Sequence, residues 1–341
     1  MPDFISFYIY DISIIQNVLK STLLTYNKEI TNSNKSTGEI LKIYYYNYLN
    51  LSFIFKENSS GIFYELQIKG SIHYYFNLGI HNANTFKFKD FLSSINNLLS
   101  IFNINPLKCV LKPCEYGFNI TFNNTDTIPH NCMAECRKLF KFEKFPFAIS
   151  GIKNNDYQIK VYSKSFQFPQ IAEPQLLRIE EKNNRSRSWQ NLGIHTLYDL
   201  LSKDNHKKIY DQFKYRIKKV IIFDEEIKKD SKNRTKLNQF NNPNYWRRLI
   251  SKGSQNKEYN RKKNELEKLS KLQGSNLSEN ILKAIEKQYC INYNTLMQST
   301  FEVIKLQTYA QYKKSTNAHL CIECNGITIH KHNNTLSLVY T

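Results

Sequence analysis

Glycine, tryptophan and methionine are scarce, with 10 Gly, 2 Trp and 3 Met among 341 residues. This composition is typical of an AT-rich genome, so the many aromatic residues are not by themselves evidence of stacking sites. No apolar run approaches the roughly 18 residues of a membrane helix, and the first twenty residues do not form a secretory signal. The seven cysteines lack the spacing of a small disulfide framework, which favours a reducing compartment. We therefore expect a cytoplasmic protein without a membrane partner.

Positive charge is in excess, with 48 Lys and Arg against 29 Asp and Glu, a net charge of +19. Such a charge attracts polyanions through phosphate contacts and counterion release. Residues 228–273 hold fourteen Lys or Arg against four acidic residues, with Tyr245, Trp246 and Tyr259 interleaved. This stretch indicates a phosphate-tracking arm, although a solvated helix face is about as common an origin for such a run. Within it we expect Arg247, Arg248, Lys262 and Lys263 to contact DNA.

Hydrophobic periodicity predicts an α+β fold, with an antiparallel sheet domain followed by a basic, mainly helical region. Strand-like segments cover 5–14, 43–56, 62–77, 109–122 and 156–168, and an amphipathic helix is expected over 86–102. Further along the chain, the pattern predicts two short helices over 195–224 and a long helix over 277–312. Asn242 and Pro243 are expected to start another helix. We predict a β-rich catalytic domain at 1–190, a helical extension at 191–227, a basic DNA-anchoring region at 228–315 and a tail at 316–341.

Three strand-like segments carry candidate chemistry: residues 112–120, 157–168 and 176–182, in chain order. In the first, Glu115 and Asn119 share a face with Gly117 between them, which leaves room for Mg²⁺, Mn²⁺ or a phosphate. A single Glu on a strand, however, is usually just solvent-facing. In the third, Arg178 and Glu180 share a face. Arg178 could clamp a phosphate and Glu180 could ligate a metal, while the plainer alternative is an ion pair within the strand.

The second segment places Lys160, Tyr162 and Lys164 on the face opposite its apolar residues. Neighbouring positive charge favours the phenolate, so we expect these lysines to lower the pKa of Tyr162. A tyrosine nucleophile for phosphodiester cleavage needs such activation. An ordinary strand tyrosine is the alternative in a chain with 23 of them.

The order of these motifs resembles that of the replication initiation factor family of rolling-circle plasmids and filamentous phages. IKVYSK (159–164) matches its Y-x-K strand, LRIE (177–180) its R-x-E strand, and CEYGFNI (114–120) its acidic strand. The segments STGEI (36–40), KGSIHYYFN (69–77), HNANTFKF (81–88) and NPNYW (242–246) are similar to those of initiators from Bacteroidota phages and mobile elements. The likeness covers roughly residues 1–270.

The resemblance implies a HUH-like, metal-dependent endonuclease that nicks single-stranded DNA through a 5′-phosphotyrosyl intermediate. Tyr162 would be the nucleophile, with Lys164 beside the scissile phosphate and Arg178 helping to meet the transition-state charge. The residues implied for Mg²⁺ or Mn²⁺ are Glu115, Asn119, Glu180 and His73, and Lys160 is a further DNA contact. Asn119 stands where the family has a second acid, and no H-x-H pair lies on a β-rich segment.

The implied partners are single-stranded or supercoiled DNA at a replication origin and host replication proteins. One alternative is a mobilisation relaxase with the same chemistry, and another is a non-catalytic DNA- or RNA-binding protein. The C-terminal segment adds Cys321, Cys324, His330 and His332, a possible Zn²⁺ site whose spacing is tighter than that of a zinc finger. Incidental thiols in a frayed tail are the alternative.

Overall fold

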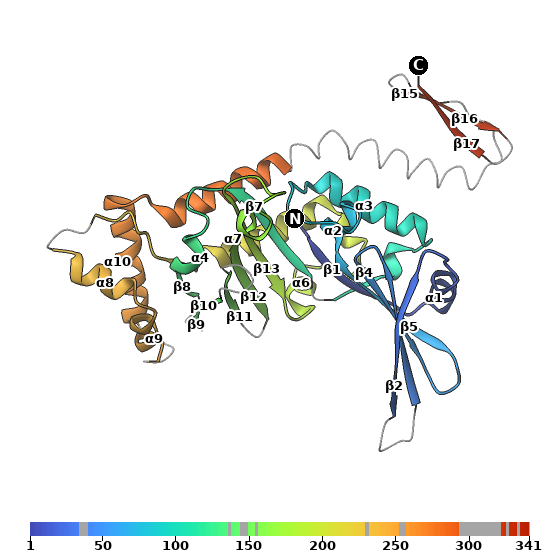
Figure 1. The fold of residues 1–341 in the computed structure, drawn as a ribbon, viewed down its shortest axis with the longest axis horizontal. Coiled ribbons are helices and arrows are strands. Elements are labelled where there is room, and N and C mark those ends of the chain that lie inside the picture. Colours follow the sequence, from blue (N-terminus) through green and yellow to red (C-terminus); the bar gives the residue numbers. More distant parts are fainter. Residues whose placement is uncertain are drawn as a thin grey trace. The chain divides into compact units, whose positions relative to one another are not determined.

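The computed structural model has the α+β fold that the sequence predicts (Figure 1). It describes residues 1–33, 40–112, 114–135, 138–143, 149–153, 156–228, 232–251, 257–292 and three C-terminal strands. Residues Met1–Asn292 form one compact unit and Tyr293–Thr341 a second. The domain boundaries at 190 and 227 stay a prediction. Among the described residues, no helix combines the length and apolar character needed to cross a bilayer.

The first sheet contains six strands, and each neighbouring pair is antiparallel. The strands are β1 Phe4–Ile9, β2 Thr25–Ser33, β3 Ile40–Tyr48, β4 Leu51–Glu57, β5 Phe63–Ser71 and β6 Val110–Leu111, in the order β2-β3-β4-β5-β1-β6. The strand predicted over 5–14 is wrong in its second half. The Asp11 side chain accepts a hydrogen bond from the Ser13 amide at 3.1 Å and caps helix α1 (Ile12–Leu19).

One face of this sheet packs against helices. Helix α3 (Phe88–Ile101) confirms the helix predicted over 86–102, and its apolar positions, including Phe91, Ile95 and Leu98, are buried. Phe102 follows α3, and its ring centroid lies 4.9 Å from that of Phe53 in β4. The short helix α2 (Ile72–Phe76) lies between β5 and α3 in the chain.

The second sheet carries the candidate chemistry. Its strands are β7 Glu115–Thr121, β10 Lys141–Glu143, β11 Ile149–Lys153, β12 Tyr157–Ser163 and β13 Leu176–Asn183, in the antiparallel order β10-β11-β12-β13-β7. Residues 1–3 lie against β7, where the Gly117 amide donates to the Met1 carbonyl and the Asp3 amide to the Glu115 carbonyl, both at 3.0 Å. The segment that leads into β1 therefore joins the two sheets.

Helix α7 (Lys203–Ile217) covers one face of the second sheet. Tyr116 and Phe118 point toward it, with ring centroids 5.7 and 5.5 Å from that of Phe213. This confirms the prediction that these two aromatics pack behind Glu115 and Asn119. The two short helices predicted over 195–224 are instead a 3-10 turn (Asp199–Leu201) followed by the single helix α7.

The basic stretch folds into three helices, α8 (Arg234–Phe240), α9 (Pro243–Ser251) and α10 (Lys257–Gln273). Helix α9 starts at Pro243 as predicted. The interleaved aromatics are not stacking residues, because Tyr245, Trp246 and Tyr259 are 9%, 0% and 4% exposed in the core that these helices share with Met133. The buried indole of Trp246 donates to the Phe240 carbonyl at 2.8 Å.

Shorter elements complete the described part of the first unit. They are a third sheet of β8 Cys132–Glu135, β9 Lys138–Leu139 and β14 Ile221–Ile222, the helices α4 Ile128–Asn131, α5 Lys164–Gln167 and α6 Arg187–Gln190, a 3-10 turn at Pro106–Lys108 and a helical segment at 277–292.

The second unit contains an antiparallel sheet of three strands, β15 Ile322–Cys324, β16 Ile327–His332 and β17 Thr335–Tyr340. Cys321 and the side chains of Cys324, His330 and His332 lie outside the described part, so the zinc site stays a prediction. Cys109, Cys114, Cys132 and Cys290 are free thiols.

Candidate active site

The register of three neighbouring strands assembles the predicted residues. Arg178 in β13 lies opposite Asn119 in β7 and opposite Tyr162 in β12, while Glu180 lies opposite Gly117 and Lys160. Directly opposed residues in an antiparallel pair share a face. The shared faces predicted within each strand are confirmed for Gly117 with Asn119, for Lys160 with Tyr162 and for Arg178 with Glu180, and the register between the strands brings these residues together.

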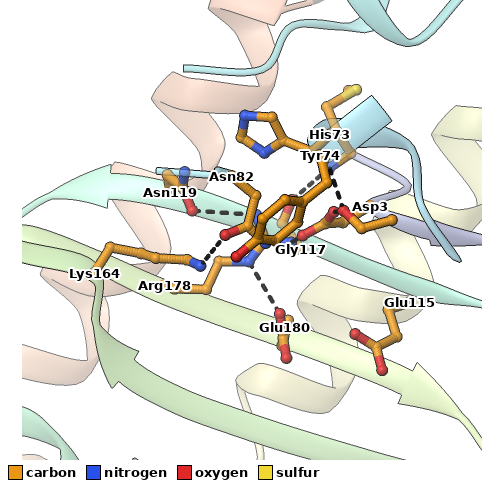
Figure 2. A network of polar contacts seen from close by, with 12 residues as sticks. Asp3, His73, Tyr74, Asn82, Glu115, Gly117, Asn119, Lys164, Arg178 and Glu180 are labelled. Atoms are coloured by element: carbon orange, nitrogen blue, oxygen red, sulfur yellow. Dashed lines mark hydrogen bonds and ion pairs between the residues drawn. The ribbon is translucent and has the colours of Figure 1, made fainter. Parts of the chain in front are cut away.

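Arg178 binds Asp3, Asn119 and Glu180 (Figure 2). With Lys160 and Tyr162, which both bind Glu180, these residues form what we define as the polar cluster: Asp3, Asn119, Lys160, Tyr162, Arg178 and Glu180. Its Nε donates to Glu180 at 3.1 Å, and its terminal nitrogens donate to Asn119 at 3.1 Å and to Asp3 at 2.9 Å. Each of the three Arg178 nitrogens donates to a protein group. A phosphate held by Arg178, as the sequence predicts, would compete with these contacts. This arrangement indicates that Arg178 positions the carboxylates of Asp3 and Glu180.

Glu180 receives positive charge from both sides. One carboxylate oxygen lies 2.9 Å from Lys160 Nζ, and the other accepts from Arg178 and, at 3.2 Å, from the Tyr162 hydroxyl. Burial opposes its ionisation, but Lys160 and Arg178 outweigh burial and hold the pKa of Glu180 at about 2. Glu180 is therefore a carboxylate anion in hydrogen-bonding reach of the tyrosine.

Tyr162 is 7% exposed. The prediction that its pKa is lowered is wrong, because burial and the Glu180 carboxylate raise the pKa of Tyr162 well above its ordinary value. Lys160 is directed at Glu180, and Lys164 Nζ lies 5.2 Å from the centre of the tyrosine ring. Tyr162 is therefore a neutral phenol at rest, and it must lose its proton during any attack.

Lys164 lies beyond the end of the strand, not on it. Ser163 accepts a hydrogen bond from the Phe166 amide at 3.2 Å and ends β12, so Lys164 begins α5. The Lys164 ammonium is buried and donates to Asn82 at 2.8 Å and to Gln167 at 2.9 Å. Burial, and then the charge of Arg178, lower the pKa of Lys164 to about 8. Near neutral pH the Lys164 side chain is therefore still mostly an ammonium cation, but it loses its proton more readily than an ordinary lysine.

Three of the predicted metal ligands already bind cationic side chains of the chain itself. Glu180 binds Lys160 and Arg178, and Glu115 lies 3.2 Å from Lys182 Nζ and 3.6 Å from Lys160 Nζ. The Asn119 oxygen accepts from Arg178. A divalent ion would have to displace these cations.

The fourth predicted ligand, His73, is not on a strand. Ser71 ends β5 by accepting from the Tyr74 amide, and His73 lies in α2. Its Nε2 lies 2.6 Å from Asn84 Oδ1, its ring stacks on Phe86, and burial lowers the pKa of His73 to about 4. Among the described residues, no three His, Cys, Asp or Glu side chains are grouped to hold a metal. The predicted set does not fit a divalent ion in this arrangement.

Asp3 is the member of the cluster that sequence reasoning missed. It is 4% exposed and binds Arg178 through one oxygen and the Ser71 hydroxyl through the other. Asp3 and Arg178 are separated by 175 positions in the chain. No local pattern marks Asp3, because only the pairing of residues 1–3 with β7 brings it to Arg178.

The close approach of β7 and β13 depends on Gly117. A Cβ at this position would lie 2.5 Å from the Ile179 carbonyl oxygen and 2.7 Å from Glu180 Cβ. We expect Gly117→Ala to cost about 1–3 kcal/mol of unfolding free energy and to displace Glu180, as measured by urea denaturation and nicking rate. Gly151→Ala on β11 is the matched control, because its nearest contact would be an ordinary 3.6 Å. Equal stability of the two variants would contradict this account of the strand contact.

The predicted DNA contacts divide into two pairs. Arg247 and Arg248 are exposed on α9. Lys262 and Lys263 on α10 have side chains only 16% and 17% exposed. Lys262 pairs with Glu265, and Lys263 donates to the backbone carbonyls of residues 218 and 219. The first pair is available to a phosphate backbone, whereas the second is used within the fold.

Comparison with known proteins gives one structural similarity. No protein-family model and no curated protein matches the chain. A solved structure of a rolling circle replication initiator protein from Geobacillus stearothermophilus is similar to it with a TM-score of 0.34 and 8% sequence identity. The similarity covers 74% of this chain and 95% of that one. Both the TM-score and the sequence identity are low.

Proposed function

We propose that this chain initiates replication of a phage or plasmid by nicking single-stranded DNA with Tyr162. The observation that carries the proposal is the hydrogen bond between the Tyr162 hydroxyl and the ionised Glu180, inside a cluster that also holds Lys160 and Arg178. A buried tyrosine bound to a carboxylate beside several cations suits attack on a phosphodiester. Tyr162 of the Y-x-K motif and both charged residues of the R-x-E motif belong to this cluster, and Lys164 Nζ lies 5.2 Å from the centre of the Tyr162 ring.

The proposed reaction is an in-line transfer to tyrosine. The Tyr162 oxygen forms a bond to phosphorus while the bond from phosphorus to the 3′ oxygen of the DNA breaks. Glu180 orients the phenol by accepting its hydrogen bond. The phenol proton passes to water as the new bond forms, and the departing 3′ oxygen takes a proton from water, so that protons balance. Lys164 and Lys160 offset the charge that develops on the phosphate. The product is a 5′-phosphotyrosyl link and a free 3′-hydroxyl for a polymerase. Because Tyr162 is 7% exposed, substrate binding must uncover its hydroxyl.

A requirement for Mg²⁺ or Mn²⁺ stays a prediction from the family resemblance, and no step of the proposed reaction depends on it. Incubation with a supercoiled plasmid that carries the origin tests the proposal, with Mg²⁺, Mn²⁺ and EDTA as separate arms. We expect conversion to the open circle in at least one arm. Binding in a gel shift without any nicking would instead identify a non-catalytic nucleic-acid-binding protein.

The basic helices are proposed to anchor DNA without reading its sequence, because contacts to phosphates carry little sequence information. Replacing Arg247 and Arg248 with Gln should weaken origin and random DNA alike. The slope of log affinity against log salt should fall by roughly 0.7–0.9 for each phosphate that is no longer neutralised. Lys262→Gln with Lys263→Gln is the control, and its slope should stay that of the wild type. Loss of origin binding alone in the arginine variant would mean that α9 reads sequence.

A further inference from the structure

The six-stranded sheet has a second face that presents tyrosines and lysines. Its central row runs through directly opposed residues, from Tyr8 in β1 across β5 and β4 to Tyr45 and Lys28. Lys112 Nζ lies 4.8 Å from the centre of the Tyr8 ring, and Lys28 Nζ lies 4.9 Å from that of Tyr45. Tyr10 stacks beside Tyr8 at 6.2 Å. We call Tyr8, Tyr10, Lys28, Tyr45, Lys69 and Lys112 the open face.

Because side chains alternate between the two faces along a strand, these tyrosines lie on the face opposite to that of the tyrosines in the core. Tyr46 and Tyr48 in β3 contact Phe55 and Phe102 on the helix side of the sheet. Tyr45 points the other way and is half-buried, and Tyr10 is 49% exposed. Aromatic rings that remain accessible beside a complete hydrophobic core are available to a partner.

The charge of the open face suits a polyanion. Lys28, Lys69 and Lys112 surround the rings, and all three are partly or fully exposed. Glu65 is a carboxylate on the same side of the sheet, and Lys56 neutralises it at 2.6 Å. Burial and the charge of Glu65 raise the pKa of Tyr8, so its phenol stays neutral. The rings therefore add no negative charge that would repel phosphates.

We propose that the open face binds single-stranded DNA, with bases stacked on Tyr8 and Tyr45 and phosphates held by the lysines. Tyr8 and Tyr45 lie three strands apart, about 14 Å at the usual strand spacing, which accommodates several nucleotides. Unpaired bases expose the π-faces that such rings bind, whereas a duplex hides them. The lysines that now cover the rings have flexible stems that can turn to the phosphates. The proposal rests on the proposed function, since it names where the strand that Tyr162 cleaves is held.

Binding of a fluorescent single-stranded oligonucleotide by fluorescence anisotropy tests the open face. All variants carry Tyr162→Phe, so that no cleavage occurs. Replacing Tyr8 and Tyr45 with Ala should weaken binding about tenfold or more for each ring removed, while binding of the same sequence as a duplex should change little. Replacing both with Phe keeps the stacking surface and should restore affinity. Tyr215→Ala is the matched control, because Tyr215 is 61% exposed on α7 with Lys219 Nζ 3.8 Å from its ring centre.

Wild-type affinity in the alanine variant would overturn the open-face proposal. So would equal losses for single strand and duplex, or a loss in the Phe variant as large as in the Ala variant. If the alanine variant does not fold, Lys28→Gln with Lys112→Gln tests the same surface and should weaken single-strand binding and flatten its salt dependence. Unchanged binding in that variant would also overturn the proposal. Because the readout is binding, failure here leaves the nicking proposal intact, and a failure of nicking leaves this result intact.

Discussion

Tyr162→Phe is expected to abolish nicking and covalent attachment to DNA while DNA affinity stays near that of the wild type. The hydroxyl is the proposed nucleophile, and the ring is buried packing that Phe preserves. The variant loses the hydrogen bond to the Glu180 carboxylate, which costs about 1.5–3 kcal/mol for a bond to a charged group. Plasmid nicking, adduct formation, a gel shift and urea denaturation measure the four effects separately.

Tyr157→Phe is the matched control for this variant. Tyr157 lies on the same strand, and its hydroxyl also binds a carboxylate, Glu135, at 2.7 Å. We expect a comparable loss of stability and full nicking activity. A covalent adduct that persists in Tyr162→Phe would mean that another tyrosine is the nucleophile.

Arg178→Ala is expected to have the largest effect on stability. It leaves the Asp3 and Glu180 carboxylates without their shared guanidinium, and both are at least 96% buried. Breaking a buried ion pair in this way costs about 3–5 kcal/mol. Urea denaturation measures the loss, with Arg187→Ala, an exposed position on α6, as the control. Asp3→Ala with Arg178→Ala should cost less than the two single changes added together.

The pH dependence of stability gives the same cluster an independent signature. The pKa of Glu180 is about 2 in the fold, against about 4.3 for an unperturbed glutamate. A lowered pKa adds stability that is complete above the unfolded value and is lost as pH falls toward the folded one. Between pH 5 and pH 3 the wild type should therefore lose more stability than Arg178→Ala. Parallel curves for the two proteins would show that Arg178 does not set the charge of Glu180.

The sequence predicted the faces of the strands correctly because side-chain alternation is a local property. The sharing of a face by Glu115, Asn119, Arg178 and Glu180 follows from the period of two residues and the antiparallel register. The sequence could not predict which of these side chains bind one another on that face. The pairing of Arg178 with Asp3, and the occupation of Glu180 by Lys160, depend on contacts between distant segments.

The errors about pKa and aromatic exposure have one physical cause, which is burial. Two lysines flank Tyr162 in the sequence, yet desolvation and Glu180 outweigh them. Tyr245 and Trp246 lie among cationic residues, but they form the core of the helices that carry those charges. Accessible rings are found instead on the six-stranded sheet, at Tyr8 and Tyr45. The composition alone could not distinguish these tyrosines from aromatic residues that reflect mutational bias.

The location of a protein–DNA adduct tests the central claim most directly. Wild-type protein is incubated with a single-stranded origin oligonucleotide, with and without Mg²⁺ or Mn²⁺, and any covalent product is digested with trypsin and analysed by mass spectrometry. Cleavage after Lys160 and Lys164 releases the peptide VYSK (161–164), in which Tyr162 is the only tyrosine. The account predicts that this peptide carries the 5′-phosphate of the cleaved strand. An adduct on any other peptide, or nicking without any adduct, would contradict it.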